Sequence, residues 1–178
     1  MLQIDHRDSH DVDIFLPDPQ LLSFFDPQKR DFQMDIQPYA YGGDGVRSLR
    51  VAFRSLGQVD FIVARTLTAS PTIQASIEGE NVLLETIPEI VTKKVYYRGF
   101  ALKPRDIFDI AAAGERCEVP LLEELRKYPN EVAKALTTLE RLDAEFVDRT
   151  IAQLAIKDQY KPIAKRALKR SKEILHAV

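Results

Sequence analysis

The sequence contains a single cysteine, Cys117, among its 178 residues. An intrachain disulfide is therefore excluded, and so is a metal site built from several thiolates. No apolar run approaches the roughly 18 to 20 residues that a bilayer span needs. The polar opening segment, residues 1–11, has none of the features of a secretory signal. These absences predict a cytoplasmic protein that does not enter a membrane.

The composition is that of a globular protein, with 45% hydrophobic and 29% charged residues. The length predicts one domain, or one domain with an appendage, with a sizeable core. The net charge of −2 hides an asymmetry. Residues 1–44 carry nine aspartates against three basic residues, whereas residues 157–173 carry seven basic residues against two acidic ones. The first segment can attract cations, and the second can attract phosphates.

The first half of the chain alternates between strand-like runs and turns. Residues 11–16 resemble a strand that is ended by Pro17 and Pro19, and residues 20–25 fit a short helix. The run 32–36 fits a helix or a strand equally well. Further strands are expected at residues 49–53, 58–64 and 72–76, with a turn over residues 42–45. This spacing predicts a largely antiparallel sheet.

Helical patterns replace the strands from Thr86 onward. Thr86 and Glu89 form a capping-box pattern, so a helix is expected to begin there and to end at Gly99. Another helix should run from Pro104 to about residue 113, and residues 118–178 show helical periodicity without strand signals. We therefore expect an α+β core over residues 1–117, with a mixed, largely antiparallel sheet and flanking helices, followed by a helical C-terminal region over residues 118–178.

Asp11 and Asp13 are the first candidate site residues. Side chains two positions apart in a strand lie on one face, and adjacent carboxylates repel each other unless a cation lies between them. Mg²⁺ often binds through one or two carboxylates together with substrate phosphates. The alternative is an ordinary solvated strand edge.

Asp60 is a third candidate because it interrupts the apolar run 59–63, where an isolated charge is costly to bury. A metal shared with Asp11 and Asp13 would compensate its charge if the strands are neighbours. A salt bridge to Arg50 or Arg65 would do so equally well.

Lys94 occupies the core-facing i+7 position of the helix that begins near Thr86, whereas Lys93 should point elsewhere. Lys94 must therefore extend to solvent, form an ion pair or contact a ligand. In the next helix, Asp106 suits the first turn, and Arg105 can pair with Asp109 four residues later. His6 and His10, among several aspartates, fit either a transition-metal site or a solvated polar segment.

Four segments, taken in this order, resemble the nucleotidyltransferase-fold toxins of the AbiEii/AbiGii family, which belong to the DNA polymerase β-like superfamily. The resemblance covers roughly residues 1–115. The segments are residues 6–15 (HRDSHDVDIF), 59–61 (VDF), 89–95 (EIVTKKV) and 103–109 (KPRDIFD).

This resemblance implies a nucleotidyltransferase-like fold and a Mg²⁺-dependent transfer of a nucleotide from an NTP to an acceptor. The implied acceptor is RNA, in particular tRNA, and the implied biological setting is a toxin with a cognate antitoxin. The implied metal ligands are Asp11, Asp13 and Asp60. Ser9, Lys94 and Arg105 are the implied nucleotide or phosphate contacts, and Asp106 is the implied acid of the last motif.

One feature of the family is not found ahead of Asp11. The family places a Gly-Gly or Gly-Ser turn and a helix before its Asp-x-Asp motif, so that backbone N–H groups can approach the nucleotide phosphates. That turn would lie before Met1. The alternative function is therefore a catalytically inactive nucleotidyltransferase-fold remnant that acts as a binding or interaction module.

Overall fold

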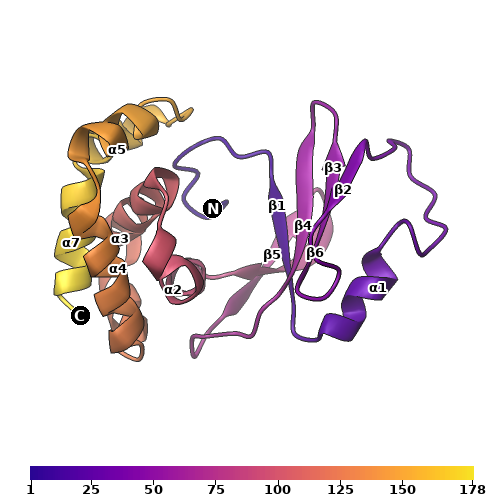
Figure 1. Cartoon of the computed structure of the whole chain (residues 1–178), viewed down its shortest axis with the longest axis horizontal. Helices are drawn as coiled ribbons and strands as arrows, with labels where there is room; N and C mark the ends of the chain where they lie inside the picture. Colours follow the sequence, from indigo (N-terminus) through magenta and orange to yellow (C-terminus); the bar gives the residue numbers. More distant parts are fainter. The chain divides into compact units, whose positions relative to one another are not determined.

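The computed structural model describes residues 1–178 as an α+β structure with six β-strands and seven α-helices (Figure 1). The chain divides into two compact units. The first, which we call the sheet unit, comprises Ser9–Thr66, and the second, the helical unit, comprises Met1–Asp8 together with Leu67–Val178. No helix combines the length and the apolar character that a bilayer span needs.

The sheet unit contains a four-stranded mixed sheet with the order β1-β4-β3-β2. β1 is parallel to β4, and the other two pairings are antiparallel. The expected mixed, mostly antiparallel sheet is thus confirmed. The strand bounds are Val12–Leu16 for β1, Ala40–Gly42 for β2, Ser48–Phe53 for β3 and Gly57–Val63 for β4.

One face of this sheet is apolar because hydrophobic residues alternate along β3. Leu49 and Val51 of β3 are buried, whereas Arg50 between them is exposed. The expected short helix is present as the 3-10 turn η1 (Pro19–Leu21) followed by α1 (Leu22–Phe25). Leu22 packs into the same small core. The remaining polar face of the sheet is the one that carries Asp60 and Arg50.

Gly57, the first residue of β4, allows the chain ahead of β1 to pass close to the sheet. It has a φ of +102°, and a Cβ placed there would lie 2.1 Å from the carbonyl oxygen of His10. Only glycine fits both the backbone conformation and this close approach. Gly57 therefore fixes the path of the residue directly before Asp11.

The helical unit begins, after its N-terminal segment, with a hairpin of β5 (Thr72–Ile77) and β6 (Glu80–Glu85). The helices that follow are α2 (Ile87–Arg98), α3 (Pro104–Leu125), α4 (Pro129–Arg141), α5 (Ala144–Ile151), α6 (Lys161–Ala164) and α7 (Ala167–His176). Short 3-10 turns, η2 (Gly99–Ala101) and η3 (Asp158–Tyr160), lie between them. The predicted helical character of residues 118–178 is confirmed.

α3 is the central helix of this unit and consists of two helical segments joined across a kink. The backbone is non-helical at Cys117, ahead of Pro120, which agrees with the expected helix from Pro104 to about residue 113 and the separate helical pattern from residue 118. Gly114 lets α7 approach closely, because a Cβ there would lie 2.3 Å from Cδ1 of Ile174. Residues 107–113 of α3 include the most buried side chains of the core, among them Ile107, Phe108 and Ile110.

α2 begins where the sequence predicted, but the capping box is incomplete. The Thr86 hydroxyl accepts the backbone N–H of Glu89 at 3.4 Å, as expected. The Glu89 carboxylate is fully buried and instead accepts the backbone N–H groups of Leu67 (3.0 Å) and Thr68 (2.8 Å). Glu89 therefore fixes the first residues of the segment that enters the helical unit, rather than capping its own helix.

Two strands were not predicted, and one ambiguous segment has no regular structure. β2 falls on residues assigned to a turn and its approach, and β6 falls on residues that received no assignment. Residues 32–36 form neither a helix nor a strand.

Candidate functional site

Three of the predicted acidic residues lie on one face of the sheet unit. β1 and β4 are neighbouring parallel strands, and Asp13 pairs directly with Asp60 in their register. Register partners in adjacent strands project to the same side, and Asp11, two residues before Asp13, shares that side. We call Asp11, Asp13 and Asp60 the acidic row. A site shared by these three carboxylates requires that β1 and β4 be neighbours, and the structure shows that they are.

Arg50 of β3 forms an ion pair with the Asp60 end of the acidic row. Its Nε donates to Asp60 Oδ1 at 2.7 Å and a terminal nitrogen donates to Oδ2 at 3.3 Å, while the Gln58 amide donates to Oδ2 at 2.8 Å. Of the alternatives for Asp60, the salt bridge to Arg50 is the one observed. The hydrogen bond that Arg50 donates to Asp60 raises the pKa of Arg50, and the charges of Asp60, Asp11 and Asp13 add to the effect.

The acidic row contains carboxylates, which are the ligands that a divalent metal such as Mg²⁺ prefers. No group of three or more His, Cys, Asp or Glu side chains lies close enough together to hold a metal ion. Both Asp60 oxygens are engaged by Arg50 and Gln58, whereas Asp11 and Asp13 are exposed. The donor set fits a Mg²⁺ held by two carboxylates and completed by phosphate oxygens, which is a usual arrangement for this ion.

A second charged cluster lies in the helical unit, between α2 and α3. The Lys94 ammonium is 2.9 Å from Asp106 Oδ1 and 3.0 Å from Asp109 Oδ2. Asp106 is fully buried, and the Lys94 side chain is only 16% exposed. Lys94 therefore points inward, as predicted, and of the outcomes considered for it the ion pair is observed.

Asp109 is the centre of this cluster and was not selected as a site residue from the sequence. Besides Lys94, it accepts hydrogen bonds from His6 Nε2 at 2.6 Å and from Arg7 Nε at 3.0 Å. Burial by itself would raise the pKa of Asp109, but the hydrogen bond from His6 and the charges of Lys94 and Arg7 outweigh it and hold this pKa well below its ordinary value.

His6 is fully buried, so neither a solvated position nor a metal site with His10 describes it. Burial lowers its pKa below the ordinary value despite the opposing effect of Asp109. Its Nδ1 is buried without a hydrogen-bond partner. This arrangement suits a neutral imidazole whose Nε2–H donates to Asp109, because a protonated ring would bury an unpaired N–H.

The prediction that Lys93 points away from the interior is wrong. Its side chain is 5% exposed, and its ammonium contacts Glu85 and lies 3.4 Å from Glu89. Two carboxylates, one at the end of β6 and one a turn earlier in α2, compensate the buried charge. Periodicity alone misses the contact with Glu85, because it depends on how the hairpin meets the helix.

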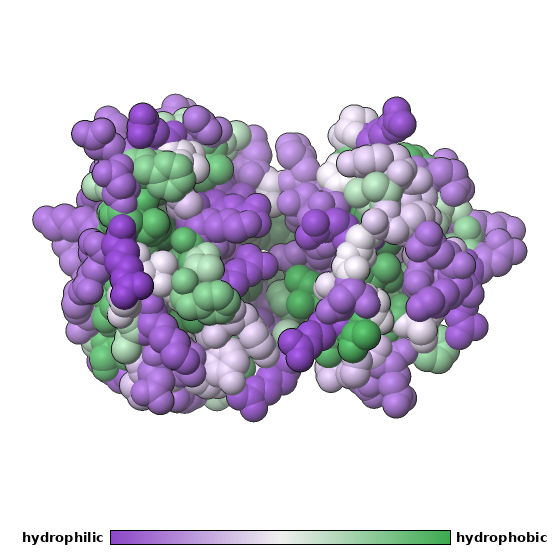
Figure 2. Space-filling model, viewed as in Figure 1, coloured by the Kyte–Doolittle hydropathy of each residue, from purple (hydrophilic) through white to green (hydrophobic).

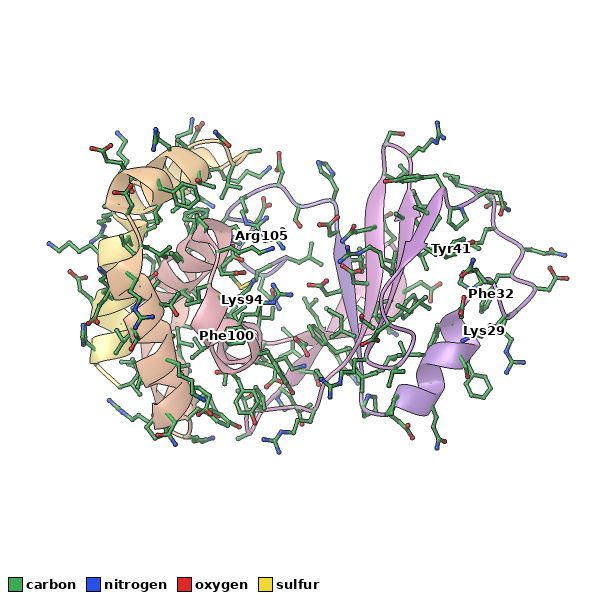
Figure 3. The ribbon with its side chains drawn as sticks, in the orientation of Figure 1. Lys29, Phe32, Tyr41, Lys94, Phe100 and Arg105 are labelled. Atoms are coloured by element: carbon green, nitrogen blue, oxygen red, sulfur yellow. The ribbon has the colours of Figure 1, made fainter.

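Arg105 does not form the expected pair with Asp109, since the oxygens of that carboxylate are taken by His6, Arg7 and Lys94. Arg105 is instead exposed. Figure 3 shows Lys94, Phe100 and Arg105 along one side of the helical unit, and Phe100 is 74% exposed. The exposure of Phe100 was not predicted from the sequence. Its position in the turn after α2 is the only sequence feature that indicates it.

The predicted site residues thus form two sets. Ser9 and the acidic row belong to the sheet unit, whereas Lys94, Arg105 and Asp106 belong to the helical unit. Ser9 is exposed and is the first residue of the sheet unit. Comparisons of the chain with models of protein families, with curated proteins and with solved structures found no match.

Proposed function

We propose that this protein is a Mg²⁺-dependent nucleotidyltransferase of the AbiEii/AbiGii type. It transfers a nucleotide from an NTP to an acceptor hydroxyl, with RNA or tRNA as the acceptor, and acts as the toxin of a toxin–antitoxin pair. The observation that supports this most is the register of β1 and β4, which pairs Asp13 with Asp60 on the face that also carries Asp11.

In this proposal Asp11 and Asp13 hold the metal. Mg²⁺, when bound with the NTP, polarises the α-phosphate and lowers the pKa of an attacking hydroxyl. Arg50 orients Asp60 through two hydrogen bonds. A guanidinium also binds phosphate oxygens well. Exchange of Arg50 from Asp60 to a phosphate would then free the third carboxylate of the acidic row.

In this proposal the helical unit supplies cationic side chains that contact phosphates. Arg105 is exposed and suits a phosphate or acceptor contact, with Ser9 as a further polar contact. Lys94 would neutralise charge on the triphosphate by exchanging its ion pairs with Asp106, at 2.9 Å, and Asp109, at 3.0 Å, for phosphate oxygens.

The second candidate function is an inactive remnant that keeps the fold and works by binding. The ion pairs favour it, because Asp60 is neutralised by Arg50 and Lys94 is held by two buried carboxylates. Such pairs are also typical of residues that serve the fold alone.

A transfer assay separates the two functions. The full chain is incubated with Mg²⁺, total RNA and each of the four α-labelled NTPs in turn, beside the Asp13→Asn and Asp35→Asn variants. Asp35 is an exposed aspartate outside the acidic row and serves as the matched control. Label in RNA that Asp13→Asn abolishes and Asp35→Asn retains supports the enzyme. A folded wild-type chain that labels nothing with any NTP supports the remnant.

A further inference from the structure

A groove with one strongly basic wall runs between α5 and the α6–α7 segment of the helical unit. It consists of two adjoining cavities of about 540 Å³ and 420 Å³, which share Asp148 and Lys165 in their linings. In Figure 2, green side chains around α5 are bordered by purple ones. The nucleotidyltransferase proposal uses none of these residues.

The basic wall is made of lysines from α6 and α7. Lys161 and Lys165 lie at the two ends of α6, whereas Lys169 and Lys172 lie three residues apart on one face of α7, and all four line the cavities. Lys161 forms an ion pair with Asp158 at 2.6 Å. Lys165 and Lys172 have no ion pair, and Lys169, which is 81% exposed, reaches Glu173 only at 4.0 Å. Most of the positive charge of this wall is therefore available to a partner.

The floor of the groove is aliphatic. Leu154 and Ile156, which are half-buried, line it together with the buried Ile151 and Leu168, and His176 is the one ring in the two linings. Single-stranded nucleic acids are usually bound with aromatic side chains on which bases stack. A floor of this kind instead suits the apolar side of a helix, which binds through residues spaced i, i+3, i+4 and i+7.

Asp148 of α5 distinguishes between a nucleic acid and an acidic protein helix as the partner of this groove. Its carboxylate is exposed, has no ion pair and lies where the two cavities meet. A uniformly charged phosphate backbone would be repelled at this point. A protein helix avoids that repulsion by placing one lysine or arginine opposite Asp148.

We propose that this groove binds an acidic amphipathic α-helix of a partner protein. The apolar side of the helix packs on the half-buried Leu154 and Ile156, its carboxylates face Lys165, Lys169 and Lys172, and one basic residue pairs with Asp148. Charge complementarity supports this occupant, and the proposal is independent of any nucleotidyl transfer.

The test uses a fluorescein-labelled synthetic peptide of 18 residues, with leucines at i, i+3, i+4 and i+7, glutamates on one flank and a single arginine on the other. Binding to the full chain is measured by fluorescence anisotropy at 0.15 M salt. A peptide of the same composition with scrambled periodicity is the first control, and a single-stranded RNA 20-mer is the competing ligand.

Lys169→Glu combined with Lys172→Glu should weaken peptide binding at least tenfold, whereas Lys134→Glu on α4 should leave it unchanged. Asp148→Lys should weaken it severalfold, and exchange of the peptide arginine for glutamate should restore binding to that variant. Circular dichroism confirms that each variant is folded.

Equal binding of the scrambled peptide, or failure of the charge exchange to restore affinity, would overturn the proposal. It would also be overturned if the RNA bound more tightly than the peptide and lost its affinity in the same lysine variant. That result would assign the groove to nucleic acid.

Discussion

At the scale of single residues, Asp109 is a buried carboxylate that three side chains share. Its side chain is 2% exposed and contacts His6, Arg7 and Lys94. Asp109→Asn leaves two buried cations without their shared anion, and breaking a buried ion pair typically costs about 3–5 kcal/mol. Urea denaturation should show a loss of this size, whereas Asp35→Asn should change the unfolding free energy by less than about 0.5 kcal/mol. A loss below about 1 kcal/mol for Asp109→Asn would contradict the assigned role.

His6 gives the fold a specific pH dependence. Its pKa in the folded state lies below the ordinary value of 6.5, so the unfolded chain binds the additional proton first. The stability from neutral His6 is complete above pH 6.5 and is lost as the pH falls toward the folded pKa, by at most about 1.4 kcal/mol per pH unit. Asp109, whose pKa is also lowered, adds a further loss below its ordinary value of 3.8.

Melting temperatures between pH 8 and pH 5 should therefore fall in the wild type and fall less in His6→Gln, which cannot take up the proton. The variant is expected to be less stable than the wild type at pH 8, where the hydrogen bond to Asp109 is intact. Parallel pH profiles for the two proteins would show that His6 is not the group responsible.

At the scale of elements, Gly57 determines how the chain enters β1. Gly57→Ala must place its Cβ 2.1 Å from the His10 carbonyl oxygen at a φ of +102°, so the backbone around Asp11 has to move. Gly79→Ala is the matched control, because its φ is +85° but nothing lies within 4 Å. The control should lose about 1–2 kcal/mol from the left-handed backbone alone.

Gly57→Ala should lose clearly more than Gly79→Ala in thermal unfolding, and it should shift the amide resonances of residues 10–13. Equal losses for the two variants would mean that the close approach at His10 is unimportant.

Glu89 connects α2 to the segment that enters the helical unit. Its carboxylate accepts the N–H groups of Leu67 and Thr68 and also the Thr68 hydroxyl. Glu89→Ala removes these acceptors and leaves Lys93 with Glu85 as its remaining acidic partner. Amide exchange at residues 67 and 68 should accelerate at least tenfold, with a smaller change in the middle of α3. Unchanged exchange at these two amides would contradict the connection.

At the scale of the whole molecule, the sequence predicts elements well where the pattern is local. The start of α2 follows from Thr86, and β3 follows from the apolar alternation at Leu49 and Val51. β2 is only three residues long and contains Gly42, so its strand character comes from pairing with β3 rather than from propensity. The two segments of α3 also follow from local patterns, because the kink at Cys117 lies between the predicted helix and the helical pattern that begins at residue 118.

The residues of the candidate site also divide into those that a local pattern predicts and those that it does not. Strand periodicity places Asp11 and Asp13 on one face, and helix periodicity turns Lys94 inward. The pairing of Asp13 with Asp60 depends on which strands are neighbours, which periodicity does not determine. The contacts of His6 and Arg7 with Asp109 join residues about one hundred positions apart, so no local pattern indicates them. Long-range charge pairing is therefore the part that the sequence leaves undetermined.

The central claim is that the acidic row binds a divalent cation together with a nucleotide. The most direct measurement is paramagnetic line broadening by Mn²⁺ in the ¹⁵N–¹H spectrum of the full chain, recorded with and without a non-hydrolysable NTP analogue. We predict selective broadening at residues 11–13 and 58–60 that strengthens with the analogue, disappears in Asp13→Asn and persists in Asp35→Asn. Broadening spread over all acidic segments, or unaffected by Asp13→Asn, would contradict the account.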